Sequence, residues 1–275
     1  MPANAQSFDG FAEQYDQAAS IERKHSFFLE NLPLKRSSVL DVGCGTGLLS
    51  HELSRHFRSV VAVDISEPML AVARRKRNAA NIDYRLCDAN NLPTEARFDA
   101  IVSHTAFHHL PSIPATLAKL RNLLAPGGRL IAVDCVARLP ATIPRWNFLY
   151  YAHAAVHFLP DSLQHGASAA GTLWRFRTSR VWIAHLKSDR YLSPARFREV
   201  YASCLPGAQF ARMMTFMGVI WNAPETKGEA SQPHHALRPT PTSVTAPAAT
   251  SATFSAKAAG VEKATDDRAG AARQL

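Results

Sequence analysis

Residues 39–47 read Val-Leu-Asp-Val-Gly-Cys-Gly-Thr-Gly, an apolar run that passes into a loop with three glycines. Glycine at these points lets the backbone turn sharply and approach a ligand closely, because no Cβ stands in the way. A helix that begins after the loop would present unpaired backbone N–H groups to that ligand. The stretch therefore predicts the end of a first strand, a ligand-binding turn and the start of a helix.

The spacing of the glycines and one acidic residue distinguish between ligands. Gly47 comes one residue too early for the dinucleotide pattern, in which a pyrophosphate lies against the loop. Asp41 stands two residues before Gly43, and its carboxylate would repel a pyrophosphate but attract an ammonium group, directly or through water. The loop therefore favours a ligand with a cationic amino-acid end over NAD.

Outward from this loop, short apolar β-branched runs alternate with segments of helical spacing. The expected strands are 38–42, 60–64, 82–86, 98–103 and 129–136, with helices at 48–56, 68–78 and 113–124 between them. Strict alternation predicts an α/β fold of the Rossmann-like, doubly wound kind, with a mostly parallel sheet and helices on both faces. Two closing strands are expected at 210–214 and 219–221, and a turn at 126–128.

One acidic residue ends the second expected strand, and another follows the third. Asp64 comes 17 residues after Gly47, where a carboxylate can accept hydrogen bonds from both hydroxyls of a ribose. Asp88 follows the third strand, where an adenine amino group could donate to it. Because the carboxyl ends of neighbouring parallel strands form the crevice that binds ligands in such sheets, these acids and the glycines predict one site.

These motifs resemble the class I S-adenosylmethionine-dependent methyltransferases, and most closely the group that includes ubiquinone and biotin-pathway methyltransferases. The resemblance covers residues 8–136 well and 190–222 loosely, and it rests on 39–47, Asp64, Asp88, 98–102, 108–110 and 124–130. It implies S-adenosyl-L-methionine as cofactor, with the methionine part on Gly43 and Gly45, the ribose on Asp64 and the adenine near Asp88. The segment around Tyr15 resembles the family's N-terminal stretch that folds over the cofactor. The full predicted cofactor site is Tyr15, Asp41, Gly43, Gly45, Asp64, Ile65, Asp88, Ala89 and Ser103.

Three histidines follow the fourth expected strand and supply the candidate general bases. Histidine suits this role because its pKa lies near neutrality. We select His104, just beyond the strand, and His108 as the catalytic candidates; for His108, with its neighbour His109, orientation of the loop or packing under the cofactor is the competing interpretation. No acidic metal triad follows the fourth strand, so we expect no metal. The Asn-Pro-Pro-aromatic signature of methyltransferases that act on amino groups is also absent, because residues 103–106 read Ser-His-Thr-Ala.

Residues 137–190 break the strand–helix rhythm and are rich in aromatic residues and arginine. We interpret them as a helical lid insertion after the fifth strand, with Arg175 and Arg177 binding an anionic or aromatic acceptor. Stacking on single-stranded RNA, a membrane-surface helix at 144–159 and an ordinary helical cap remain as alternatives.

Composition sets the boundaries and the broad class. The chain has 275 residues, a net charge of +9 and four widely spaced cysteines, which excludes a disulfide framework. Residues 1–224 are expected to form one methyltransferase domain. Residues 225–275 hold 13 Ala, 7 Thr and 4 Pro, and this composition predicts a disordered tail. Without a visible secretory signal or membrane-spanning run, we expect a cytoplasmic protein.

The sequence thus predicts a methyltransferase that acts on a small molecule, by O- or C-methylation of an anionic aromatic, acyl or quinone-like metabolite. Two alternatives remain: a catalytically silent protein that binds the cofactor and other partners, and an RNA-directed methyltransferase. Nucleic acid is the less favoured partner, peripheral membrane contact stays open, and no obligate protein partner is evident.

Overall fold

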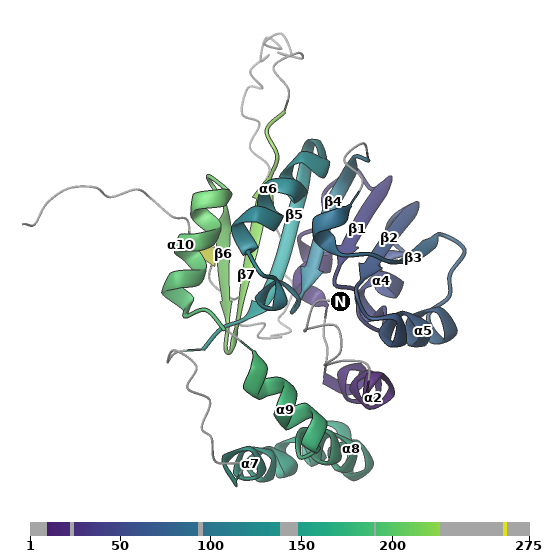
Figure 1. Ribbon diagram of the computed structural model, residues 1–275, viewed down its shortest axis with the longest axis vertical. Helices are drawn as coiled ribbons and strands as arrows, with labels where there is room; N and C mark the ends of the chain where they lie inside the picture. The colour runs from purple at the N-terminus through teal and green to yellow at the C-terminus, as the bar shows by residue number, and fades with distance from the viewer. Residues whose placement is uncertain are drawn as a thin grey trace, which may run out of the picture.

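One sheet runs through the part of the chain that the computed structural model describes, which comprises residues 10–22, 25–92, 96–137, 148–189, 191–225 and 261–262 (Figure 1). Its strands are β1 (Ser38–Val42), β2 (Ser59–Asp64), β3 (Ile82–Leu86), β4 (Phe98–His104), β5 (Leu124–Cys135), β6 (Gln209–Met213), β7 (Phe216–Asn222) and β8 (Val261–Glu262). The helices are α2 (Ala12–Glu22), α3 (Ser26–Glu30), α4 (Leu48–Leu53), α5 (Glu67–Lys76), α6 (Ile113–Leu123), α7 (Phe148–His165), α8 (Ala167–Arg177), α9 (Arg180–Ser188) and α10 (Pro194–Cys204), with single 3₁₀ turns η1 (Ala89–Asn91) and η2 (Phe107–His109).

The strand order is β3-β2-β1-β4-β5-β7-β6-β8. Strands β1 to β5 pair in parallel, whereas β7 pairs antiparallel with β5 and β6, and β8 antiparallel with β6. The order reverses between β1 and β4, and open α/β sheets bind their ligands beyond the carboxyl ends of the strands at such a reversal. The predicted Rossmann-like, doubly wound, mostly parallel sheet is confirmed.

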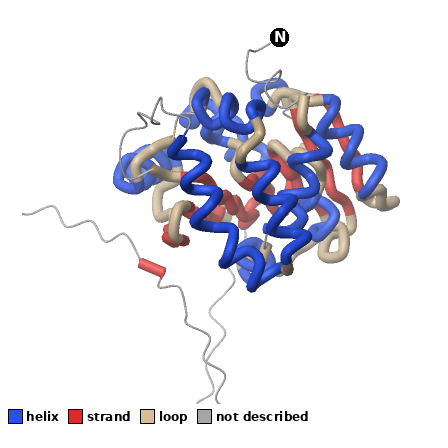
Figure 2. Tube along the Cα trace, turned by 90° about the horizontal axis from the view of Figure 1, so that it is seen from below, coloured by secondary structure: helices blue, strands red, loops and turns tan. Residues whose placement is uncertain are grey.

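Helices pack against the sheet in Figure 2, and alternating side chains of the strands are buried in two separate clusters, one on each face. On one face, Leu40 belongs to a buried cluster that takes in Leu120 of α6 and Phe197 of α10. On the other face, Val39 packs in a cluster with Leu53 of α4. This period-2 burial on both faces explains why the strands read as nearly continuous apolar runs.

The boundary of β5 differs from the sequence prediction. The structure begins β5 at Leu124, so the expected turn at residues 126–128 lies within the strand rather than before it. The pairing of β4 with β5 shifts register here, from Phe98 opposite Leu124 to Ala100 opposite Arg129. Gly127 adopts a positive φ of 68°, and the extra residues form a bulge instead of a turn that separates two elements.

Helices α7, α8 and α9 follow β5, so the insertion is helical as predicted, and Figure 1 shows them with α2 in a layer below the sheet. Leu173 and Phe176 of α8 pack in one buried cluster with Ala18 of α2. No helix among the described residues is long and apolar enough to cross a membrane. The prediction of a disordered tail falls outside the described residues, apart from Glu225 and strand β8.

Candidate functional site

The glycine loop forms the tight turn that the sequence predicts at the carboxyl end of β1. The backbone N–H groups of Gly43 and Cys44 both donate to the carbonyl of Val63, at 2.9 and 3.0 Å. Gly43 and Gly45 have φ angles of 71° and 54°, which glycine adopts without steric cost. A Cβ on Gly43 would lie 2.3 Å from the Cβ of Ala106, whereas a Cβ on Gly45 would meet no atom within 4 Å. Gly45 therefore faces open space.

Asp64 organises this loop with both of its carboxylate oxygens. Oδ2 accepts a hydrogen bond from the backbone N–H of Gly45 at 2.7 Å, and Oδ1 accepts one from Ser66 at 3.0 Å. Ser66 is in turn the N-cap of α5, and its hydroxyl accepts from the N–H of Met69. One side chain therefore ties the end of β2 to the loop after β1 and to the start of α5.

A first cavity of about 130 Å³ lies beside the loop, at the carboxyl ends of β1, β2 and β4. Of the nine predicted cofactor residues, seven line it: Tyr15, Gly43, Gly45, Asp64, Ile65, Asp88 and Ala89. Asp88 also caps η1, because its Oδ1 accepts from the backbone N–H of Asn90 at 2.8 Å. The structure thus brings together predicted residues from four separate segments of the chain.

Asp41 and Ser103 do not line this cavity. Asp41 is buried, and its Oδ2 accepts a hydrogen bond from the hydroxyl of Ser50 at 2.6 Å. Ser103 is also buried, and its hydroxyl donates to the carbonyl of Val42 at 2.9 Å. The structure places both behind the glycine loop, where they brace β1 against α4 and β4, rather than in contact with a ligand in the cavity.

A second cavity, of about 550 Å³, adjoins the first and falls within the size range of small-molecule sites, about 300–1,000 Å³. The two cavities share four lining residues, Tyr15, His104, Thr105 and His109. Thr105 follows β4 with a φ of 55°, a left-handed conformation that is strained for a threonine. Such strain at the boundary between two cavities is typical of functional sites.

The predicted base His104 ends β4 and lines both cavities. Its ring contacts those of His25 and Phe28, with centroids 5.6 and 5.3 Å away. The second candidate, His108, lines only the second cavity. Of the two histidines, only His104 therefore reaches both cavities.

Asp134, which sequence reasoning missed, fixes the position of His108. Its Oδ1 lies 2.5 Å from Nδ1 of His108, and its Oδ2 accepts from the backbone N–H of the same residue at 2.8 Å. Asp134 precedes the last residue of β5, so its place at the carboxyl edge of the sheet was a signal that could have identified it. Burial, followed by the charges of His108 and His185, lowers the pKa of the neighbouring His109 to about 2.

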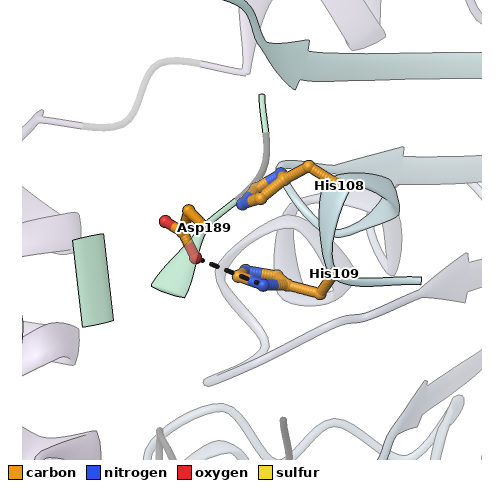
Figure 3. Close-up of side chains that lie close together, drawn as sticks. All are labelled: His108, His109 and Asp189. Atoms are coloured by element: carbon orange, nitrogen blue, oxygen red, sulfur yellow. Dashed lines mark ion pairs between the residues drawn. The ribbon is translucent and has the colours of Figure 1, made fainter. Parts of the chain in front are cut away.

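Asp189, just after α9, faces this histidine pair, as Figure 3 shows. Its Oδ1 lies 3.5 Å from Nδ1 of His109, and its Oδ2 accepts from the hydroxyl of Tyr191 at 2.5 Å. Nε2 of His185 lies 3.5 Å from the same Oδ2. No sequence spacing links Asp189 to residues 108–109, and only the folding of the insertion over the sheet brings them together.

The two predicted substrate arginines lie away from both cavities. Arg177 pairs with Glu22 of α2 and Asp161 of α7, and these two carboxylates raise its pKa although burial alone would lower it. Arg175 donates to the hydroxyl of Thr172 within α8 at 3.2 Å. The insertion contributes other side chains to the second cavity instead, namely Phe176, Trp182, His185, Leu186 and Asp189.

The chain is similar to known methyltransferases over part of its length. Residues 39–128 match the family model of the methyltransferase domain. An uncharacterized methyltransferase of Mycobacterium tuberculosis is 42% identical over 108 residues, which are 38% of this chain and 54% of that protein. A malonyl-[acyl-carrier protein] O-methyltransferase of Bacillus cereus is 31% identical over 132 residues, 45% of this chain and 49% of that protein. The chain thus spans about half the length of the curated relatives it matches.

Solved methyltransferase structures share the fold of this chain. A solved structure of the DhpI–SAH complex has a similar fold, with a TM-score of 0.51 and 19% sequence identity. The match covers 82% of this chain and 93% of that one. The cavity residues fit S-adenosylmethionine, the cofactor of this superfamily, because Gly45 leaves open the space that a Cβ would fill and Asp64 and Asp88 border it. Residues 39–128 thus match a methyltransferase domain, and the chain has a fold similar to that of the class I S-adenosylmethionine-dependent methyltransferases.

Proposed function

We propose that this chain transfers the methyl group of S-adenosylmethionine to a small molecule held in the second cavity. The observation that carries the proposal is the shared wall of Tyr15, His104, Thr105 and His109 between the two cavities. When bound, the cofactor supplies an already activated methyl group. The protein must then hold the acceptor close and in line and keep water away, and two adjoining cavities meet that need.

The lining of the second cavity supports an aromatic, acyl or quinone-like acceptor. Aromatic rings from three parts of the chain surround it: Phe27, Phe28, Phe176, Trp182 and Phe216. No Lys or Arg occurs among its described lining residues, so the anionic character expected from Arg175 and Arg177 gains no support. The match to a malonyl-[acyl-carrier protein] O-methyltransferase favours oxygen as the methylated atom.

We assign the general base to His104 and place His108 on the acceptor side. His104 lines both cavities, so it lies where the acceptor and the methyl group must meet. His108 is held by Asp134 and lines only the second cavity. A positioned base typically contributes about 10²–10⁴-fold in rate.

The cofactor part of the proposal is tested by calorimetry with S-adenosylhomocysteine. Asp64→Ala removes a carboxylate that borders the first cavity and orders the loop, and we expect roughly 10- to 100-fold weaker binding from the lost charge-assisted hydrogen bonds. Asp83→Ala is the matched control, because Asp83 is exposed on β3 and pairs with Arg85. Equal affinities for the two variants would contradict the proposed cofactor site.

The transfer step is tested with methyl-labelled S-adenosylmethionine and a fractionated metabolite extract. We expect label in a small molecule, and in His104→Ala a kcat reduced about 10²–10⁴-fold. Since His104 also lines the first cavity, cofactor affinity should change far less than kcat. His56→Ala serves as control, since His56 lies away from both cavities. Label found in RNA would favour the RNA-directed alternative, and cofactor binding without any labelled product would favour the silent binding protein.

A further inference from the structure

Two imidazoles and one carboxylate converge on a single point in the wall of the second cavity. One potential ligand atom from each of His108, His109 and Asp189 lies within 4.8 Å of the others. Figure 3 shows the two rings side by side with the carboxylate opposite them, and the ring centroids are 3.9 Å apart. A tetrahedral ion with bonds of about 2.0–2.2 Å holds its donors about 3.3–3.6 Å apart, and Nδ1 of His109 lies 3.5 Å from Oδ1 of Asp189.

The buried carboxylate of Asp189 leaves one oxygen, Oδ1, available to bind a cation. Its side chain is only 2% exposed, and its Oδ1 has no hydrogen-bond partner among the described residues. Nδ1 of His109 lies 3.5 Å from this oxygen. A buried carboxylate is costly unless it is paired, hydrogen-bonded or bound to a metal.

Two of the three side chains are held from behind by hydrogen bonds. Asp134 engages Nδ1 of His108 at 2.5 Å, which directs the other ring nitrogen of that histidine away from Asp134. The hydroxyl of Tyr191 donates to Oδ2 of Asp189 and leaves Oδ1 toward His109. Histidine and carboxylate ligands of protein metal sites are characteristically oriented by such outer partners.

We propose that His108, His109 and Asp189 bind a divalent first-row transition-metal ion, for which Zn²⁺ is the test ion. The open coordination position of this ion faces the second cavity. Two imidazoles and a carboxylate are a donor set of zinc and non-haem iron sites, whereas magnesium and calcium prefer oxygen ligands. All three residues line the second cavity, so a further ligand can reach the ion from there. The expectation of no metal from the sequence is replaced by this assignment.

The role of the ion rests on the proposed function, although its binding does not. A hydroxyl of the acceptor that coordinates the ion becomes more acidic, as metal-bound water does. Its O–H bond breaks and the proton passes to His104. The oxygen electron pair then forms the bond to the methyl carbon, while the carbon–sulfur bond of the sulfonium breaks and its electron pair stays on sulfur. This assignment makes His108 a ligand and leaves His104 as the base.

The test measures Zn²⁺ binding to the full chain by competition with a chromophoric chelator, without cofactor or acceptor. We expect tight 1:1 binding in the wild type, loss of it in Asp189→Asn and His109→Ala, and about 10- to 100-fold weaker binding in Asp134→Asn. The matched control is the double variant His153→Ala/His157→Ala. It removes two histidines of α7 whose rings lie beside each other, with centroids 4.4 Å apart, and which do not line the second cavity. The control should keep the tight site.

Two results would overturn the proposal: wild-type affinity in Asp189→Asn, or loss of the tight site in the α7 control. Co²⁺ in place of Zn²⁺ adds a second readout, because its visible absorption should report nitrogen and oxygen ligands in the wild type and not in Asp189→Asn. A wild type without these bands would also overturn it.

Calorimetry with S-adenosylhomocysteine separates this proposal from the previous one and verifies folding. Asp189 does not line the first cavity, so Asp189→Asn should bind this ligand like the wild type while it loses zinc. Failure of the proposed function would appear instead as absent S-adenosylhomocysteine binding in the wild type, whatever its affinity for zinc.

Discussion

Two glycines two residues apart have different tasks, although both adopt left-handed backbone conformations. Gly43 is closely packed against Ala106, whereas Gly45 borders the first cavity and has open space where a Cβ would lie. Because both φ angles are left-handed, the backbone strain of an alanine would be similar at the two positions, about 1–2 kcal/mol. The difference lies in what the added methyl group would contact.

We accordingly predict a separation of stability from binding. Gly43→Ala forces its Cβ against Ala106 and should lower the melting temperature markedly. Gly45→Ala should cost little more than the backbone strain but should weaken S-adenosylhomocysteine, because its methyl group enters the space left for the ligand. Calorimetry and thermal unfolding of both variants check this, and the reverse order of effects would show that the loop is placed differently.

Asp99 illustrates a residue whose contribution depends on pH. Burial alone would raise the pKa of Asp99, but Lys35 and the backbone N–H groups of Ser37 and Ser38 more than offset this, and the pKa lies below its ordinary value. The carboxylate joins the start of β4 to the segment before β1. Since the folded-state pKa is lower than the unfolded one, the stabilisation is complete above about pH 4 and is lost as the pH falls through the folded value.

Asp99→Asn should therefore lower the free energy of unfolding near pH 7, by about 1–3 kcal/mol for hydrogen bonds to a charged group. The difference from the wild type should shrink below about pH 4, where the wild-type carboxylate also becomes neutral. Urea unfolding between pH 7 and pH 3 measures both values, with exposed Asp83→Asn as control. A difference that is constant over this range would exclude an ionic contribution.

At the scale of elements, Arg177 holds the insertion to the rest of the chain. From α8 it pairs with Glu22 of α2 and with Asp161 of α7, so one guanidinium connects three helices. Helices α2, α8 and α9 each contribute lining residues to the second cavity. The arginine therefore acts on the cavity through the position of its walls.

We predict that Arg177→Ala raises the KM for the acceptor and speeds proteolytic cleavage within α7–α9, with little change in cofactor affinity. Arg175→Ala is the matched control, because the hydrogen bond of Arg175 is to Thr172 of its own helix and it forms no ion pair with a described residue. Steady-state kinetics and limited proteolysis distinguish the variants. Equal increases in KM for the two would instead support direct recognition of an anion by both arginines.

At the scale of the whole molecule, the sheet was predictable because its signals are local. Strands β1 and β3 have the bounds expected from the sequence, and Gly43, Asp64 and Asp88 lie at or just after the ends of strands. Asp189 and Tyr191 were not predictable, since their contacts with residues 108–109 depend on how the helical insertion folds back. The ion pairs of Arg177 were not predictable for a related reason, because its acidic partners Glu22 and Asp161 lie far away in the sequence.

The composition of residues 226–275 supports a prediction about truncation. Removal of these residues should leave S-adenosylhomocysteine binding unchanged, because the lining residues of the first cavity all precede residue 112. It also removes β8, whose two residues pair with β6 at the edge of the sheet, so the melting temperature should fall by no more than a few degrees. Thermal unfolding of the shortened chain checks this, and a large fall would show that the removed part stabilises the domain.

The parallel arrangement also determines where this protein can be engineered. Asp99, Lys35 and Ser37 lie together at the amino ends of β1 and β4, whereas the side chains that border the two cavities gather at the carboxyl ends. Stabilising substitutions are usually easy to find, and their recurrent cost is activity lost where a site needs strain or freedom to move. Substitutions that raise thermal stability are thus best sought at the amino ends of the strands. Substitutions that change the acceptor are best sought at the carboxyl ends.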